Sequence, residues 1–260
     1  MVIYHPIQHF VAIQSSVIPL SGKLGKLVFY QLNGKDVVRS LPQPYELTVN
    51  SRNAGKDFGK ASAAASCLLQ AISAAGSGVA DNQLYHRLNS CFIKLMGTAH
   101  NKPTGEREIA DGDLSLLKGL HLNRHRSARA VFPVAMAATI HPAGEIFIRF
   151  AGFRWPARKS LPARAGSLLI QVCCYACDFQ AKAVSVTQFD QLIGLNDPLP
   201  ADTAYNFFAE DIEGRVAVIA VGFHYLDQAG KPIGDRNWRA GNIIEAALVQ
   251  QGRIVPFGGL

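Results

Sequence analysis

The sequence is poor in charge. Asp, Glu, Lys and Arg make up 17% of its 260 residues, below the roughly 25% that is typical of soluble domains. Apolar residues account for 48%, which is ample for a buried core, and the length fits one large domain or two small ones. A surface with so little charge favours self-association or a large buried interface over a freely diffusing monomer.

A dense block of basic residues is also missing. The net charge is +7 and the isoelectric point is about 9.3. This balance permits nucleic acid or another anionic partner without requiring one.

Long apolar runs are absent as well. The longest uncharged windows, such as residues 130–143, contain Pro, His and Thr and are typical of strands, so no membrane span is expected. The first 22 residues lack a positive region and are interrupted by Pro6, so no cleavable signal peptide is expected. Export without a cleaved signal stays open.

Cysteine is scarce and unevenly placed. The five cysteines are odd in number and have no framework spacing, which suits a reducing compartment such as the cytoplasm. Cys174 and Cys177 form a C-x-x-C pair, but a zinc site needs two further ligands, and His121 and His125 lie far upstream. On a strand the two thiols would face opposite sides, so buried strand cysteines are favoured over a metal or redox site.

Catalytic signatures are missing too. No G-x-S-x-G nucleophile elbow occurs, and Gly22-Lys23-Leu24-Gly25-Lys26 is too short for a phosphate loop and leads into a strand instead of a helix. Acidic residues near 210–213 fall in a predicted turn without a partner histidine. We therefore predict no catalytic residue, no metal and no cofactor.

The best-specified stretch is residues 21–42. Two β-rich runs, residues 27–30 and 37–38, flank Asn33-Gly34, the dipeptide best suited to positive φ at both centres of a tight turn. This pattern predicts a β-hairpin. Alternation places Phe29 on one face and Tyr30 on the other, so both faces carry apolar side chains and both need cover.

Two helices follow in the sequence. Asn53 is a candidate cap for an alanine-rich helix that ends at Gly76 and Gly78, and Asp81 for a second helix that ends at Gly97. A short Gly/Ser connection makes them a helical hairpin. The polar stretch 98–112 predicts a boundary between residues 1–112, with the arm, hairpin and helical pair, and residues 113–260.

The second part has strand periodicity. Strands are predicted near residues 130–140, 145–153, 167–177, 183–188, 203–209, 216–226 and 242–249, with Gly- and Pro-containing turns between them. Strands at this spacing are typical of a β-sandwich. The predicted fold class is α+β, mainly β, with an N-terminal hairpin and a helical hairpin followed by an antiparallel sandwich.

Two motifs in the hairpin carry a family resemblance. Ser21-Gly22-Lys23-Leu24-Gly25 and Val37-Val38-Arg39-Ser40-Leu41-Pro42 resemble the opening of an uncharacterised bacterial family of small proteins. That family has a glycine-punctuated hairpin ending in Arg-Ser-x-Pro, an alanine-rich helical segment and then sandwich-like material. The resemblance implies this architecture and no activity.

The main functional hypothesis is a non-enzymatic structural or assembly protein that binds other copies of itself. Low charge, the two-faced hairpin and the apolar arm of residues 2–20 support it, because an added strand gains main-chain hydrogen bonds at a sheet edge. The candidate assembly residues are Ile3, Ile7, Phe10, Val11, Ile13, Phe29 and Tyr30.

The alternative is a nucleic-acid-binding accessory protein. If two basic clusters met in space, their cations would track phosphates while an aromatic ring stacked on bases. The competing interpretation is a pair of solvated loops, which the absence of a nucleic-acid fold signature favours. The candidate residues are Arg124, Arg126, Arg129, Arg154, Trp155, Arg158 and Lys159.

Overall fold

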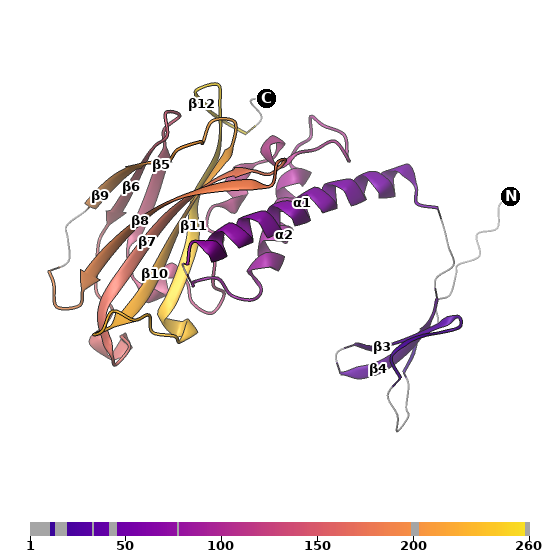
Figure 1. The fold of residues 1–260 in the computed structure, drawn as a ribbon, viewed down its shortest axis with the longest axis horizontal. Helices are drawn as coiled ribbons and strands as arrows, with labels where there is room; N and C mark the ends of the chain where they lie inside the picture. Colours follow the sequence, from indigo (N-terminus) through magenta and orange to yellow (C-terminus); the bar gives the residue numbers. More distant parts are fainter. Residues whose placement is uncertain are drawn as a thin grey trace. The chain divides into compact units, whose positions relative to one another are not determined.

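The computed structural model describes residues 11–13, 20–32, 34–41, 46–76, 78–198 and 203–257, and Figure 1 shows the ribbon. The fold is α+β and mainly β, as the sequence predicts. The chain divides into two compact units, Met1–Thr48 and Val49–Leu260. This division differs from the expected boundary at residue 112, because the helical pair shares its core with the large sheet that follows.

The N-terminal unit contains a four-stranded antiparallel sheet in the order β1-β4-β3-β2. Its strands are β1 (Val11–Ile13), β2 (Gly22–Leu24), β3 (Leu27–Leu32) and β4 (Lys35–Ser40). Leu32 pairs with Lys35, which leaves a two-residue connection at 33 and 34, and Gly34 has φ +76°. The predicted hairpin is therefore present, although Asn33 lies outside the described residues.

The large unit is built on a five-stranded antiparallel sheet in the order β12-β11-β10-β7-β8. The strands are β7 (Ala165–Asp178), β8 (Ala183–Gly194), β10 (Val216–Asp227), β11 (Arg239–Gln250) and β12 (Arg253–Val255). Central strand β10 is buried from its first residue to its last but one. A strand buried on both sides needs a layer on each face of the sheet.

A three-stranded sheet supplies the layer on one face and completes the predicted sandwich. It consists of β5 (Ala135–Ile140), β6 (Glu145–Ala151) and β9 (Thr203–Phe208) in the order β5-β6-β9. Inward residues of β6, such as Ile148 and Phe150, share a core with Val172 and Ile219 of the larger sheet. The burial pattern along β6 alternates strictly, as expected for a strand with one solvated face.

Helices cover the other face (Figure 1). The helical hairpin consists of α1 (Val49–Ala74) and α2 (Leu84–Gly97), and its buried residues share a second core with the opposite side of β7, β10 and β11. Leu68 and Ile72 of α1 and Leu88 and Phe92 of α2 have no exposed surface in this core. The large unit thus has three layers, with the five-stranded sheet in the middle.

Several element boundaries differ from the sequence-based ones. Helix α1 begins at Val49 instead of next to Asn53, and Gln83 precedes α2 in place of Asp81. The expected strand at residues 130–140 begins only at Ala135, because Pro133 lacks a backbone N–H, and a short helix, α3 (Ala128–Val131), comes before it. The additional single turns are η1 (Ile109–Asp111), η2 (Leu114–Leu117), η3 (Arg158–Ser160) and η4 (Arg236–Trp238).

Candidate functional site

The N-terminal sheet presents two chemically different faces, which follow from its strand register. Side chains of directly opposed residues lie on the same face of an antiparallel sheet. Gly22 is opposite Phe29, which is opposite Val38, and Leu24 is opposite Leu27. This face therefore carries the apolar side chains of Leu24, Leu27, Phe29 and Val38, beside the polar Gln31, Asp36 and Ser40, and we call it the apolar face.

The opposite face mixes apolar and basic residues. Lys23 is opposite Val28, Tyr30 is opposite Val37, and Leu32 is opposite Lys35. The Arg39 guanidinium lies 5.6 Å from the centre of the Tyr30 ring, a cation–π distance. This basic face consists of Lys23, Val28, Tyr30, Leu32, Lys35, Val37 and Arg39.

The apolar face is largely open to solvent. Leu24 is 67% exposed and Leu27 is 43% exposed, and Val37 on the basic face is the one buried hydrophobic residue of this unit within its described part. A globular domain normally has at least two packed layers around a core. The described part of the N-terminal unit has one.

The predicted assembly residues are distributed as follows. Ile3, Ile7 and Phe10 lie outside the described residues. Val11 and Ile13 belong to β1, which pairs with β4 within the same chain through Val11–Arg39 and Ile13–Val37. Phe29 and Tyr30 are half-buried on opposite faces of β3, as the alternation predicts. Leu24 and Leu27, the most open apolar residues of the apolar face, were not among the predicted residues.

The first basic cluster is tied into the helical layer. The Asp81 carboxylate accepts a hydrogen bond from the Arg124 backbone N–H at 2.8 Å, and the Arg124 guanidinium donates to Gln83 Oε1. The Arg126 guanidinium lies 5.8 Å from the centre of the Trp238 ring. Arg129, in contrast, is exposed on α3. These contacts give Arg124 and Arg126 a role in holding the segment before α3.

The second cluster contributes two residues to the wall of the largest cavity described, which has a volume of about 800 Å³. Trp155 and Arg158 line it, together with residues from the end of β8 and from the β10–β11 connection such as Leu192 and Gln228. The Trp155 ring lies 5.4 Å from the Phe132 ring, centre to centre. Because Phe132 directly follows α3, the two clusters are carried by segments that pack together.

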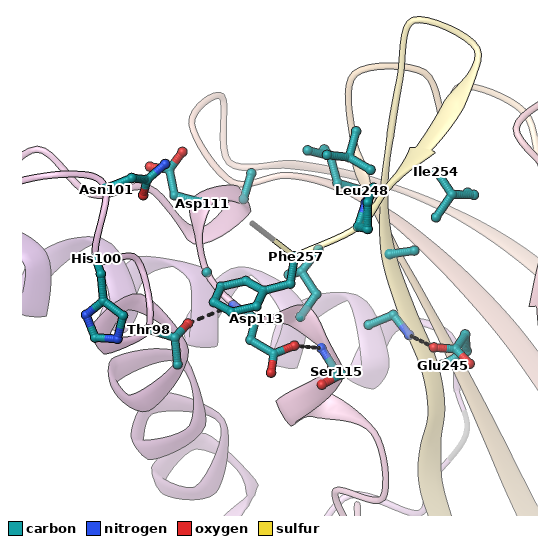
Figure 2. A pocket seen from close by; sticks show the side chains of 17 residues that line it. Thr98, His100, Asn101, Asp111, Asp113, Ser115, Glu245, Leu248, Ile254 and Phe257 are labelled. Atoms are coloured by element: carbon teal, nitrogen blue, oxygen red, sulfur yellow. Dashed lines mark hydrogen bonds between the residues drawn. The ribbon is translucent and has the colours of Figure 1, made fainter. Parts of the chain in front are cut away.

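A second cavity of about 500 Å³ lies between the segment after α2 and strands β11 and β12 (Figure 2). Asp113 Oδ1 accepts from the Ser115 N–H at 3.0 Å, Glu245 pairs with Lys118 at 2.7 Å, and Asp111 pairs with Lys102. All three carboxylates in the cavity wall are thus engaged within the chain, which gives them a structural role.

The C-x-x-C pair is embedded in the sheet. Cys174 packs in the core beneath the three-stranded sheet and Cys177 in the core beneath the helices, so the pair points to opposite faces, as expected for a strand. Burial raises the pKa of the Cys174 thiol to about 12. A thiol that stays protonated is a poor nucleophile and metal ligand. Among the described residues, no group of His, Cys, Asp and Glu side chains has an arrangement that could hold a metal ion.

The helical side of the sheet contains one buried histidine that sequence reasoning missed. His224 lies on β10, and burial lowers the pKa of its imidazole to about 4, with the nearby Arg239 acting in the same direction. Within the described part of the chain, His224 Nε2 has no hydrogen-bond partner, and neither does the Oε1 of Gln171 on the adjacent strand. A buried unpaired polar atom costs about 1–3 kcal/mol.

Comparison of the chain with protein-family models, with curated proteins and with solved structures found no match. In the described ranges, no helix has the length and hydropathy needed to cross a membrane.

Proposed function

We propose that this chain is a non-enzymatic assembly protein whose copies associate through the apolar face of the N-terminal sheet. The observation that carries the proposal is the exposure of Leu24 and Leu27 on a sheet that is a single layer in its described part. Each copy contributes one sheet, and two apolar faces stacked together form the two-layered sandwich that either sheet lacks alone.

A second copy is the partner that suits this face best. In a two-fold interface the same patch meets itself, so the patch must tolerate its own charge. In its described part the apolar face carries one ionisable side chain, that of Asp36, which accepts a hydrogen bond from Gln31. The basic face carries Lys23, Lys35 and Arg39, and stacking two such faces would bring like charges together, which costs several kcal/mol.

The dimensions of the sheet predict weak association. Two strands of six residues and two of three residues, spaced about 4.8 Å apart, cover roughly 300 Å², so two faces bury roughly 600 Å². Stable interfaces bury about 1,200–2,000 Å². Self-association through this face alone is therefore concentration-dependent.

Strand β1 offers an additional route to the same assembly. It occupies the β4 edge of the sheet through pairs that involve Val11, Ala12 and Ile13, and the same pairs form equally well between copies if β1 is exchanged. Exchange of an identical element adds stability to an oligomer without any new kind of contact. Deleting residues 1–19 removes this route and should shift the protein toward monomers.

Sedimentation velocity tests the proposal. Protein concentrations of about 1–100 µM suit an interface of this size. We expect Leu27→Lys to weaken association at least tenfold, because it places a buried cation in the apolar interface. The matched control is Leu32→Lys, a substitution of another exposed leucine, 53% open, on the basic face.

The control variant should associate as the natural sequence does. A strictly monomeric protein over the whole concentration range contradicts the proposal. Equal weakening by Leu32→Lys and Leu27→Lys contradicts it as well, because the effect would then not depend on the face.

A further inference from the structure

The cavity beside the second basic cluster has the composition of a ligand site. Its volume of about 800 Å³ falls within the range of roughly 300–1,000 Å³ for small-molecule sites. Trp155, Leu161 and Leu195 provide apolar wall, whereas Ser167, Asn196 and Gln228 provide hydrogen-bonding groups. Sites for small molecules combine these two features, with a few polar groups that fix orientation.

The segment that forms one wall of this cavity is rich in positive charge. The segment that forms one wall carries Arg154, Arg158, Lys159 and Arg164, and no Asp or Glu occurs between Glu145 and Asp178. None of the four side chains makes an ion pair or hydrogen bond in the described part of the chain, whose ion pairs lie elsewhere. Arg158 lines the cavity, and the other three cations of the same segment add to the positive potential beside it, which attracts an anion.

Among the described residues, Asp227 is the one that places a carboxylate in the wall, and this carboxylate is already engaged. Its Oδ1 accepts hydrogen bonds from the backbone N–H groups of Ala229 and Lys231, both at 2.9 Å. It therefore shapes the turn after β10. The segment that contains Arg158 carries four cations between residues 154 and 164, against this one described carboxylate in the wall.

We propose that this cavity binds a nucleotide unit, with the base against the Trp155 side of the wall and the phosphate at Arg158 and the neighbouring cations. A base has an apolar face for the indole and leucine wall and a polar edge for Asn196 and Gln228. Its phosphate suits guanidinium groups, which bind phosphate oxygens through paired N–H donors. A free nucleotide and a single-stranded nucleic acid both present this chemistry.

Tryptophan fluorescence measures binding at the cavity itself. The chain has two tryptophans, so a Trp238→Phe variant leaves Trp155 as the only one. This variant is titrated with adenosine monophosphate and, separately, with a short oligothymidylate at about 50 mM salt. We expect saturable quenching by at least one probe. If the oligonucleotide contacts four cations, its affinity falls roughly fifty-fold between about 50 and about 200 mM salt.

The charge-neutralised variant tests the proposed contacts. Replacing Arg154, Arg158, Lys159 and Arg164 by Gln should weaken binding at least tenfold. A matched variant removes the same charge from α1, α2 and β12, at exposed positions outside the cavity, and should bind as before; its substitutions are Arg52→Gln, Lys56→Gln, Lys94→Gln and Arg253→Gln.

Comparison of the two probes shows whether the ligand is a free nucleotide or part of a nucleic-acid strand. Tight binding of the mononucleotide identifies a free nucleotide, whereas binding of the oligonucleotide alone identifies a single strand. No saturable change with either probe overturns the proposal, as does an equal loss of affinity in the matched variant.

Discussion

Arg87 donates two hydrogen bonds from Nη1 to the Asp81 carboxylate, at 3.0 and 3.1 Å, and both residues also bind the segment 122–124 that leads into the sandwich. Asp81 also accepts from the backbone N–H groups of Gln83 and Arg124, and Arg87 donates to the carbonyl oxygen of Leu122. Burial alone would raise the pKa of Asp81, but these hydrogen bonds hold it below its usual value.

Removing this carboxylate should destabilise the large unit. We expect Asp81→Ala to lower the free energy of unfolding by about 3 kcal/mol, because it leaves two backbone N–H groups and a partly buried guanidinium without their acceptor. Asp81→Asn keeps one oxygen acceptor and should cost less. Urea unfolding of both variants measures the difference.

A double-mutant cycle with Arg87→Gln separates the pair from its surroundings. Because the two side chains are in contact, the combined loss should be smaller than the sum of the single losses. Additive losses would mean that the two groups act independently.

His224 should make stability depend on pH. Burial lowers the pKa of His224 from its ordinary 6.5 to about 4. At pH values between these two, the imidazole is protonated in the unfolded chain but not in the folded chain. Stability is therefore fully present above pH 6.5 and falls as the pH drops toward 4, by an amount on the order of 3 kcal/mol. Asp190 on β8 partly opposes this shift.

Urea unfolding at several pH values measures this slope. His224→Gln should reduce it, whereas His141→Gln, at an exposed residue of the β5–β6 turn, should leave it unchanged. An unchanged slope in His224→Gln would assign the pH dependence to other groups.

The two units should differ in their ability to fold alone. Both hydrophobic cores consist of residues after Thr48, so a fragment of residues 49–260 should fold and melt within about 2 °C of the full chain. A fragment of residues 1–48 has a single-layered sheet in its described part, and a chain this short rarely folds without a partner or a cross-link. Circular dichroism melts of both fragments measure this.

A fragment of residues 49–260 that unfolds well below the full chain would contradict this prediction. It would show that the N-terminal unit contributes to the stability of the large one.

Local pattern was enough for much of the fold. Three features are set by neighbours within a few residues. They are the short connection between β3 and β4, the β-rich runs that became β7 and β10, and the period-2 alternation that separates Cys174 from Cys177. The division of the chain was not predictable in this way. The helical pair belongs with the sheet because Leu68 and Phe92 pack with Cys173 and Val218, and contacts between residues so far apart leave no local signal.

The candidate sites show the same limit. Phe29 and Trp155 stood out by residue type, but Leu24 looks like any apolar strand residue until its exposure is known. The cavity wall draws Trp155, Leu192 and Gln228 from three separate segments, which only the topology brings together. Asp81 had a capping pattern, yet its carboxylate holds Arg87 and Arg124 as well, because the chain returns to it after forty residues.

Two glycines should respond oppositely to alanine. A Cβ at Gly112 would lie 2.2 Å from the Leu95 carbonyl oxygen, whereas one at Gly59, within α1, would meet nothing within 4 Å. Gly112→Ala should therefore destabilise by about 1–3 kcal/mol, and Gly59→Ala should stabilise by about 0.5–1 kcal/mol. Urea unfolding measures both, and a neutral Gly112→Ala would show that the loop after α2 can move away from the helix.

The thiols of β7 should be protected by the fold itself. Cys173, Cys174 and Cys177 are buried, whereas Cys67 and Cys91 are half-buried. The thiolate is the reactive form, and burial raises the pKa of each β7 thiol. In the folded protein at pH 8, Ellman's reagent should modify at most two thiols quickly, while all five should react in urea.

Destabilisation should accelerate labelling of the protected thiols. If modification of the β7 thiols requires unfolding, the labelling rate is proportional to the unfolded population. Asp81→Ala is expected to lower the free energy of unfolding by about 3 kcal/mol, which raises that population roughly 150-fold. The rates of Cys67 and Cys91 should change less, because local motion suffices to expose them. Strand β7 is paired with a neighbour on both sides along its length, so its thiols should not become accessible without global unfolding. Rapid modification of more than two thiols in the natural protein would contradict this prediction.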